Sequence, residues 1–75
     1  MQWELIRLRK ENNLYQEYVA KVLGISANSY GMKERGETQF TADEMFILRD
    51  LFGLPLEEIF LPRKLGNTEI KKVKI

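Results

Sequence analysis

The chain has 75 residues, of which 44% are hydrophobic and 31% are charged, and its formal net charge is +1 at pH 7. This length corresponds to one small domain, and the absence of cysteine and histidine excludes disulfides, thiol nucleophiles, Cys/His metal sites and the commonest general base. We therefore expect no enzymatic activity, no cofactor and no metal. No apolar run approaches the roughly 20 residues of a membrane span, and the N-terminus lacks the apolar region of a signal peptide, so we expect a cytoplasmic protein.

The charges are unevenly distributed along the chain. Residues 1–36 carry a net charge of +2, from six basic and four acidic side chains. Residues 37–60 carry −5, from Glu37, Asp43, Glu44, Asp50, Glu57 and Glu58 against Arg49, and residues 61–75 carry +4, from Arg63, Lys64, Lys71, Lys72 and Lys74 against Glu69. If nucleic acid is the partner, the acidic middle must face away from it, because phosphate contacts dominate affinity. The alternative is a solvated charge pattern that serves no partner.

The spacing of apolar residues predicts a first helix over residues 2–12. Leu5 and Leu8 lie three positions apart, which places them on one face of a helix. Asn12 and Asn13 follow, and asparagine tolerates the left-handed conformation that often closes a helix.

Residues 16–36 predict two short helices joined by a tight turn. The first, over residues 16–23, has an apolar edge formed by Val19, Ala20, Val22 and Leu23. Tyr15 precedes it but is a poor N-cap, because its hydroxyl lies too far from its own backbone. Gly24 is suited to end the helix, since glycine adopts positive φ without steric cost.

Ser26 is a suitable N-cap for the next helix, over about residues 27–35. Tyr30 is the large side chain that can anchor its inner face, whereas four residues are expected to point outward: Ala27, Asn28, Gly31 and Met32. Gly31 is unusual, because glycine inside a helix costs about 1 kcal/mol relative to alanine. Either it lets the helix lie close to a backbone or it has no selected role.

Two further helices are expected before a basic tail. Thr41 and Glu44 form a capping box at the start of the fourth helix, with Phe40 placed to pack on Met45, and the helix continues to Gly53. Pro55 suits the opening turn of a short fifth helix over residues 56–60. These elements define a domain at residues 1–61.

Residues 62–75 form a basic C-terminal tail. Gly66 and Asn67 predict a turn or linker. In residues 68–75, Val73 and Ile75 alternate with lysines, which is compatible with a strand and equally with a disordered arm.

These residues resemble the phage repressor and Cro-like (XRE-type) helix-turn-helix family of bacterial regulators. The resemblance covers residues 3–61 and rests on Leu8, Arg9, Leu14, Gln16, Val19, Ala20, Leu23, Gly24, Ile25, Ser26, Tyr30, Glu34, Arg35, Gly36 and the run from Leu56 to Phe60. It implies an all-α fold, a compact five-helix bundle like the lambda-repressor DNA-binding domain. The third helix is then expected to enter the major groove of double-stranded DNA.

The resemblance implies a sequence-specific transcriptional regulator, a repressor or Cro-like protein, from a bacterium or phage. Such domains usually bind DNA as homodimers. Candidate dimer contacts are the tail and the surface around Phe52, Leu54 and Leu56. The alternative is a protein-interaction module, an antitoxin-like or anti-repressor partner with secondary DNA binding, which the acidic residues 37–60 and the small set of base-reading residues favour.

Family members touch bases at the positions that match Ala27, Asn28 and Met32, and the DNA backbone at those that match Gln16 and Ser29. The Asn28 amide can pair bidentately with adenine, which is worth about 1–3 kcal/mol of discrimination. The alternatives are that Asn28 is an ordinary polar residue near a helix start and that Gln16 is an ordinary surface residue.

Arg9 and Glu34 match a pair that, in the family, joins the first helix to the end of the third. Lys10, Lys33 and Arg35 are then the candidate phosphate contacts, unless they are ordinary surface charges. Lys33 departs from the family pattern, which has an apolar residue there, so its stem is expected to pack while its ammonium reaches outward.

Overall fold

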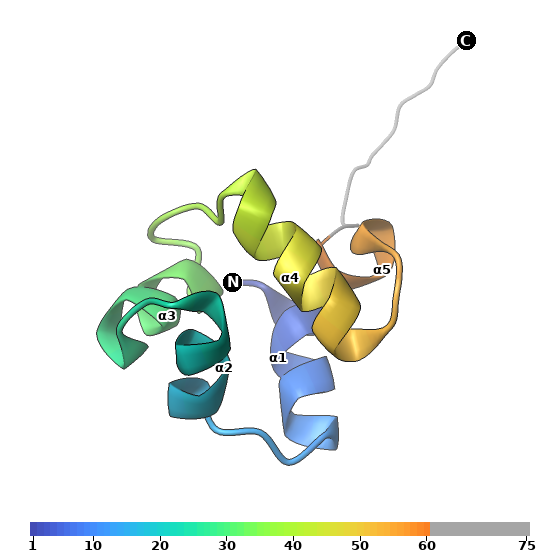
Figure 1. Cartoon of the computed structure of the whole chain (residues 1–75), viewed down its shortest axis with the longest axis horizontal. Coiled ribbons are helices and arrows are strands. Elements are labelled where there is room, and N and C mark those ends of the chain that lie inside the picture. Colours follow the sequence, from blue (N-terminus) through green and yellow to red (C-terminus); the bar gives the residue numbers. More distant parts are fainter. Residues whose placement is uncertain (61–75) are drawn as a thin grey trace, which may run out of the picture.

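The computed structural model describes residues 1–60, and the expectations for the tail, residues 62–75, lie outside the described residues. Within them the chain forms five helices: α1 (Trp3–Glu11), α2 (Gln16–Leu23), α3 (Ala27–Glu34), α4 (Ala42–Phe52) and α5 (Leu56–Phe60) (Figure 1). The expected all-α fold is confirmed. None of the helices in residues 1–60 combines the length and apolar character that crossing a membrane requires.

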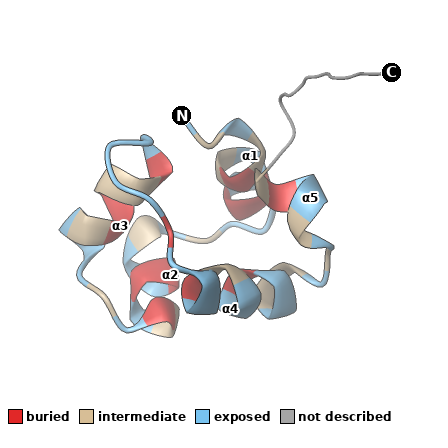
Figure 2. Ribbon diagram, turned by 90° about the horizontal axis from the view of Figure 1, so that it is seen from above, coloured by how far each residue is buried: buried red, intermediate tan, exposed pale blue. Residues whose placement is uncertain are grey.

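The helices pack so that the two elements of the helix-turn-helix lie at one end of the domain. α2 packs against α3 and α4, while α5 packs against α1 and α4. Figures 1 and 2 both place α3 and α5 at opposite ends of the molecule. The buried residues lie on the inward sides of the helices, and much of the outward side of α3 and α4 is exposed (Figure 2).

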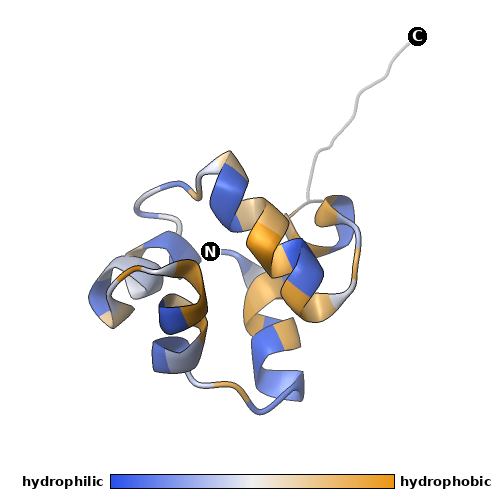
Figure 3. Cartoon of the chain, viewed as in Figure 1, coloured by the Kyte–Doolittle hydropathy of each residue, from blue (hydrophilic) through white to orange (hydrophobic). Residues whose placement is uncertain are grey.

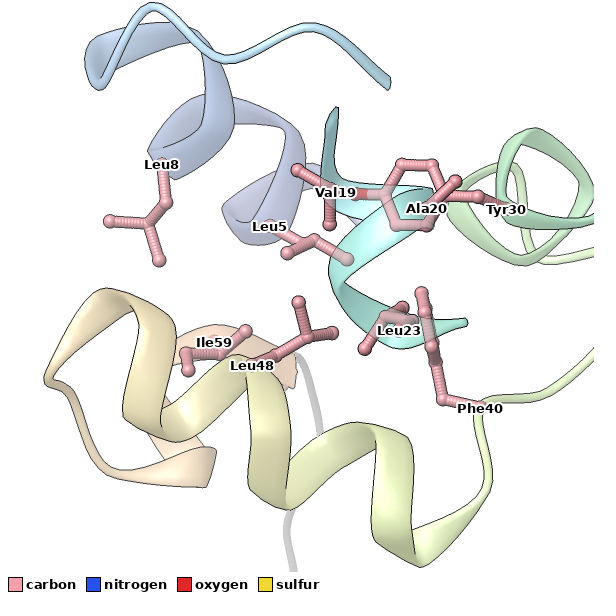
Figure 4. Close-up of a cluster of buried hydrophobic side chains, with 9 residues drawn as sticks. All are labelled: Leu5, Leu8, Val19, Ala20, Leu23, Tyr30, Phe40, Leu48 and Ile59. Atoms are coloured by element: carbon pink, nitrogen blue, oxygen red, sulfur yellow. The ribbon is translucent and has the colours of Figure 1, made fainter. Parts of the chain in front are cut away.

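The core draws side chains from all five helices and from the loop before α4. Figure 4 shows them converging: Leu5, Leu8, Val19, Ala20, Leu23, Tyr30, Phe40, Leu48 and Ile59. Phe40 lies edge-on to Tyr30 and to Phe60, with ring centroids 6.1 and 5.3 Å apart. Because Tyr30 is fully buried and lies on α3, this aromatic contact fixes that helix against the rest of the domain.

The residues expected around a dimer contact are partly committed to the core. Phe52 and Leu54 are half-buried and pack against the core, and Leu56 is half-buried as well. Each keeps some exposed surface, so a dimer contact around them stays a prediction.

The helix ends follow the local sequence. Asn13 has φ 58° and turns the chain from α1 toward α2, and Gly24 has φ 76° at the end of α2. At the start of α4, the Thr41 hydroxyl accepts a hydrogen bond from the Glu44 N–H at 3.1 Å. The Glu44 carboxylate in turn accepts one from the Thr41 N–H at 2.9 Å, so the predicted capping box is confirmed.

Replacing Thr41 with alanine should lower the free energy of unfolding by about 1 kcal/mol, because the first turn of α4 then loses its cap. Urea denaturation followed by circular dichroism measures the change. Thr38→Ala, in the exposed loop before α4, is the control and should leave stability nearly unchanged. Equal effects of the two substitutions would contradict the cap's contribution.

Candidate nucleic-acid interface

A short turn sets the angle between α2 and α3. Gly24 closes α2 in the left-handed conformation, and the Ile25 N–H donates to the Ala20 carbonyl at 3.0 Å. Ser26 then caps α3 by accepting a hydrogen bond from the Ser29 N–H at 3.0 Å. Both helix ends at the turn are therefore satisfied locally, which holds the two helices in one arrangement.

The outward face of α3 carries the residues expected to read bases. Ala27 and Asn28 are exposed at its first turn, and Met32 is half-buried one turn later. The Asn28 amide lies 4.0 Å from the Met32 sulfur, so these two side chains lie side by side. Ser29 is half-buried, which leaves it a smaller exposed surface than Asn28.

Glu34 is the centre of a buried polar network at the end of α3. Its carboxylate accepts hydrogen bonds from Arg9 Nε at 2.8 Å and Arg9 Nη2 at 3.2 Å. The Tyr30 hydroxyl donates to the same carboxylate at 2.7 Å, and the Gln16 amide donates to it at 2.8 Å. The Glu34 carbonyl also accepts from the Gln2 N–H at 2.9 Å. The expected Arg9–Glu34 pair is thus present, and three helices meet at one carboxylate.

The network sets the charge states of its members. Burial alone would raise the pKa of Glu34, but the hydrogen bonds from Arg9, Tyr30 and Gln16 outweigh it and hold that pKa below its ordinary value. Burial and the hydrogen bond to Glu34 raise the pKa of Tyr30. The hydrogen bond with Glu34 also raises the pKa of Arg9. At neutral pH the site therefore holds a carboxylate, a guanidinium and a neutral phenol.

Gln16 is tied to this network and still lies at the surface. One N–H of its amide is bonded to Glu34, and since an amide nitrogen carries two hydrogens, the other remains for a further acceptor. Tyr15 provides no side-chain cap for α2, so the first turn of α2 keeps free backbone N–H groups and the positive end of the helix dipole. These features suit an anion.

Gly31 explains how close α2 and α3 come at this point. It is buried, which makes the expectation that it points outward wrong. A Cβ atom at Gly31 would lie 3.3 Å from Arg35 Nη1 and 3.8 Å from Gln16 Oε1. The glycine therefore leaves room for the Arg35 guanidinium, whereas a Cβ atom would make only an ordinary contact with Gln16.

The structure contradicts the expectation that Lys33 reaches outward. Its side chain is only 14% exposed, and its ammonium donates to Glu44 Oε1 at 2.8 Å and to the Gln39 carbonyl at 3.0 Å. Lys33 therefore forms an ion pair with Glu44 of the capping box, and its bond to the Gln39 carbonyl holds the loop between α3 and α4 in place. Burial would raise the pKa of Glu44, but the bond from Lys33 and the capping bonds hold it below its ordinary value. Because its ammonium is bound in this way, Lys33 is not placed to contact a DNA phosphate, contrary to the expectation.

The other two candidate phosphate contacts remain at the surface. Lys10 is exposed and, together with Tyr15, lines a cavity between the end of α1 and the start of α2. Arg35 is about half exposed and pairs with Glu37 at 2.8 Å, a surface ion pair that contributes little to stability and can exchange partners. Both cations therefore flank the surface formed by α2 and α3.

Sequence reasoning missed two exposed aromatic residues at the start of α2. Tyr15 is 79% exposed and Tyr18 is 50% exposed, so two phenol groups lie at the surface near the start of α2. The pattern could have indicated Tyr18, because Val19, Ala20 and Leu23 define the inward face of the helix and place Tyr18 outside it. Among residues 1–60, no group of three or more acidic side chains is placed to bind a metal ion.

Comparison with known proteins identifies a family and a fold. The sequence profile of the helix-turn-helix family HTH_3 matches residues 5–59. A crystal structure of a transcriptional regulator from Listeria innocua is similar to this chain, with a TM-score of 0.76 and 24% sequence identity; the match covers 88% of this chain and 63% of that one. This chain thus spans less than two thirds of that regulator, and at this identity the likeness shows the fold alone. No curated protein matches the chain significantly.

Removing one member of the buried pair should destabilise the domain strongly. Arg9→Met leaves the buried Glu34 carboxylate without its cation, which should cost about 3–5 kcal/mol in free energy of unfolding. Arg7→Met, on the same helix, removes only exposed ion pairs with Glu4 and Glu11 and should change stability little. Urea denaturation at pH 7 measures both variants. An equally small decrease in the free energy of unfolding for Arg9→Met and Arg7→Met would contradict a stabilising role of the Glu34 network.

Stability should also fall in acid. The pKa of Glu34 in the folded state lies below its ordinary value of about 4.5, so the unfolded chain binds protons more readily. The carboxylate's contribution is complete above that value and is lost as the pH falls through the folded-state pKa. Glu34→Gln should flatten the dependence of unfolding free energy on pH below about 4.5. An unchanged slope, measured by urea denaturation at several pH values, would show that Glu34 is not responsible.

Proposed function

Because the chain belongs to the helix-turn-helix family of Cro/C1 (XRE) type, a family of DNA-binding regulators, we propose that it is a sequence-specific transcriptional regulator. In this proposal it is a repressor or Cro-like protein that inserts α3 into the major groove of an operator and acts by occupying the site. It acts in the cytoplasm of a bacterium, encoded by the bacterium or by a phage.

The observation that carries the proposal is the exposed first turn of α3. In helix-turn-helix proteins the N-terminal residues of the second helix of the motif contact base edges, and here Ala27 and Asn28 are exposed at that place. Asn28 supplies a hydrogen-bonding amide for adenine, whereas Ala27 and Met32 offer apolar contact to a thymine methyl group. Since only Asn28 of these three carries an amide, we expect modest discrimination between sequences.

Contacts to the DNA backbone are proposed to surround this reading face. The free amide hydrogen of Gln16 and the first turn of α2 are placed to bind one phosphate. Ser29 lies on α3 beside the reading residues, and Lys10 and Arg35 add positive charge. These contacts position the domain and give little sequence preference.

The chain is further proposed to bind as a homodimer, at least on DNA. A two-fold dimer places two copies of α3 about 34 Å apart, which matches one turn of the DNA helix and a palindromic operator. This part of the proposal rests on the geometry of helix-turn-helix docking.

The two central contacts should respond differently to substitution. Gln16→Ala should weaken binding to all sequences alike, whereas Asn28→Ala should relax the preference at one base position and cost about 1–3 kcal/mol on the preferred site. Fluorescence anisotropy with a selected operator and its single-base variants measures both. Glu57→Gln, on α5 at the far end of the domain, is the control. Equal losses for Asn28→Ala on the selected and random duplexes would contradict base reading by Asn28.

The alternative, a protein-interaction module with secondary DNA binding, gives a different result in the same assay. A regulator should lose affinity steeply as the salt concentration rises, because its phosphate contacts release counterions. It should also discriminate among sequences, because its contacts to base edges depend on the base pairs present. Weak binding that is indifferent to sequence at both low and moderate salt would favour the alternative.

A further inference from the structure

The outward face of α4 combines an apolar centre with acidic ends. Phe46 is 46% exposed and Ile47 is 37% exposed, and the middle of α4 is orange on the hydropathy scale of Figure 3. Asp43 and Asp50 are exposed one turn before and one turn after this pair, so positions 43, 46, 47 and 50 share one helix face. This face, residues Asp43, Phe46, Ile47 and Asp50, is here called the α4 face.

Arg49 is a cation that contacts the α4 face. The Arg49 guanidinium lies 5.0 Å from the centre of the Phe46 ring, and its Nε is 3.3 Å from Asp50. Asp43 forms no salt bridge with any other described residue. The face therefore keeps an excess of negative charge at its N-terminal end.

This charge pattern disfavours pairing of the α4 face with itself. In an antiparallel pair of α4 helices related by a two-fold axis between Phe46 and Ile47, Asp43 of one copy would meet Asp50 of the other. Like charges brought together in this way oppose association. A suitable occupant should instead carry positive charges interleaved with apolar side chains.

We propose that the occupant is the chain's own C-terminal segment, residues 68–75. Its sequence, TEIKKVKI, provides Ile70, Val73 and Ile75 for the apolar centre and Lys71, Lys72 and Lys74 for the aspartates. The segment is thus complementary to the α4 face in both charge and hydrophobicity. The charges along the sequence are complementary as well: residues 37–60 carry a net charge of −5, and residues 61–75 carry a net charge of +4.

The chain is long enough to make this contact within one molecule. α5 packs against α4 and ends at residue 60, and the seven residues that link it to the segment, 61–67, can span about 25 Å, whereas α4 is about 16 Å long. A segment attached this close to its site has an effective concentration on the order of millimolar, so a weak contact suffices. α3 lies at the opposite end of the domain from α5 (Figures 1 and 2), so the described chain ends beside α4 and away from the reading helix.

The test is a paramagnetic spin label at the end of the segment, in the full chain. The sequence has no cysteine, so a cysteine added after Ile75 creates one labelling site and keeps every apolar and basic residue of the segment. In an NMR spectrum of the ¹⁵N-labelled protein, the amides of α4 around Phe46 should lose most of their signal, and those at the start of α3 should not. Loss of signal centred on α2 and α3, uniform weak losses, or no loss would overturn the proposal.

Two controls separate this contact from other causes. Asp43→Asn together with Asp50→Asn should restore much of the α4 signal, whereas Glu17→Gln, an exposed acid on α2, should not; failure of the aspartate substitutions to act would contradict the proposed charge pairing. Mixing spin-labelled unenriched protein with unlabelled ¹⁵N protein detects contacts between molecules. Signal loss at α4 of the same size in that mixture would show that the segment binds a second copy, which would overturn the intramolecular proposal.

Discussion

The carboxylate of Glu34 is the interaction on which the arrangement of the helix-turn-helix depends. It is nearly inaccessible to solvent and accepts hydrogen bonds from α1, from α2 and from its own helix, through Arg9, Gln16 and Tyr30. A buried carboxylate is costly unless each of its acceptor sites is used. Because these donors come from different helices, satisfying the carboxylate requires those helices to take one relative position.

The same interaction links the stability of the domain to its surface. Gln16 gives one amide hydrogen to Glu34 and keeps the other for the solvent side, so a residue that we propose to contact DNA is oriented by a buried charge. Gly31 contributes by leaving space for the Arg35 guanidinium. A side chain that is held before its partner arrives loses less conformational freedom on binding. The network can therefore contribute to affinity without touching the ligand.

A second polar contact performs a comparable task at the junction between α3 and α4. Glu44 caps α4 through Thr41 and also accepts a hydrogen bond from Lys33. One carboxylate thus starts a helix and fixes the preceding loop. Of the six acidic side chains in residues 37–60, Glu44 is buried and the other five are exposed: Glu37 before α4, Asp43 and Asp50 on α4, and Glu57 and Glu58 on α5.

The helices were predictable because their signals are local. The capping box at Thr41, the N-cap at Ser26 and the glycine at position 24 each act within a few residues, and the spacing of apolar residues placed Leu5 and Leu8 on one face, which is buried. Contacts between distant residues were not readable in this way. The Arg9–Glu34 pair, 25 positions apart, was expected only through the resemblance to a family.

The ammonium of Lys33 was misplaced for the same reason. Its partner Glu44 lies eleven positions away across a loop. The sequence around Thr41 and Glu44 predicts the capping box, but it does not indicate that the capping carboxylate also binds a lysine. The burial of Gly31 likewise depends on how closely α2 approaches α3. Of the residues proposed to read bases, Ala27 and Asn28 are exposed on α3 as expected, whereas Met32 is half-buried.

The most direct test of the account is to titrate the ¹⁵N-labelled chain with a DNA duplex selected from a random pool and to follow the backbone amides by NMR. If α3 reads the groove and α2 holds the backbone, the largest chemical-shift changes should fall on residues 27–32 and on the first turn of α2, with smaller changes on α5. Chemical-shift changes centred on α4 and α5 would contradict this account. So would the absence of any chemical-shift change with the duplex in large excess.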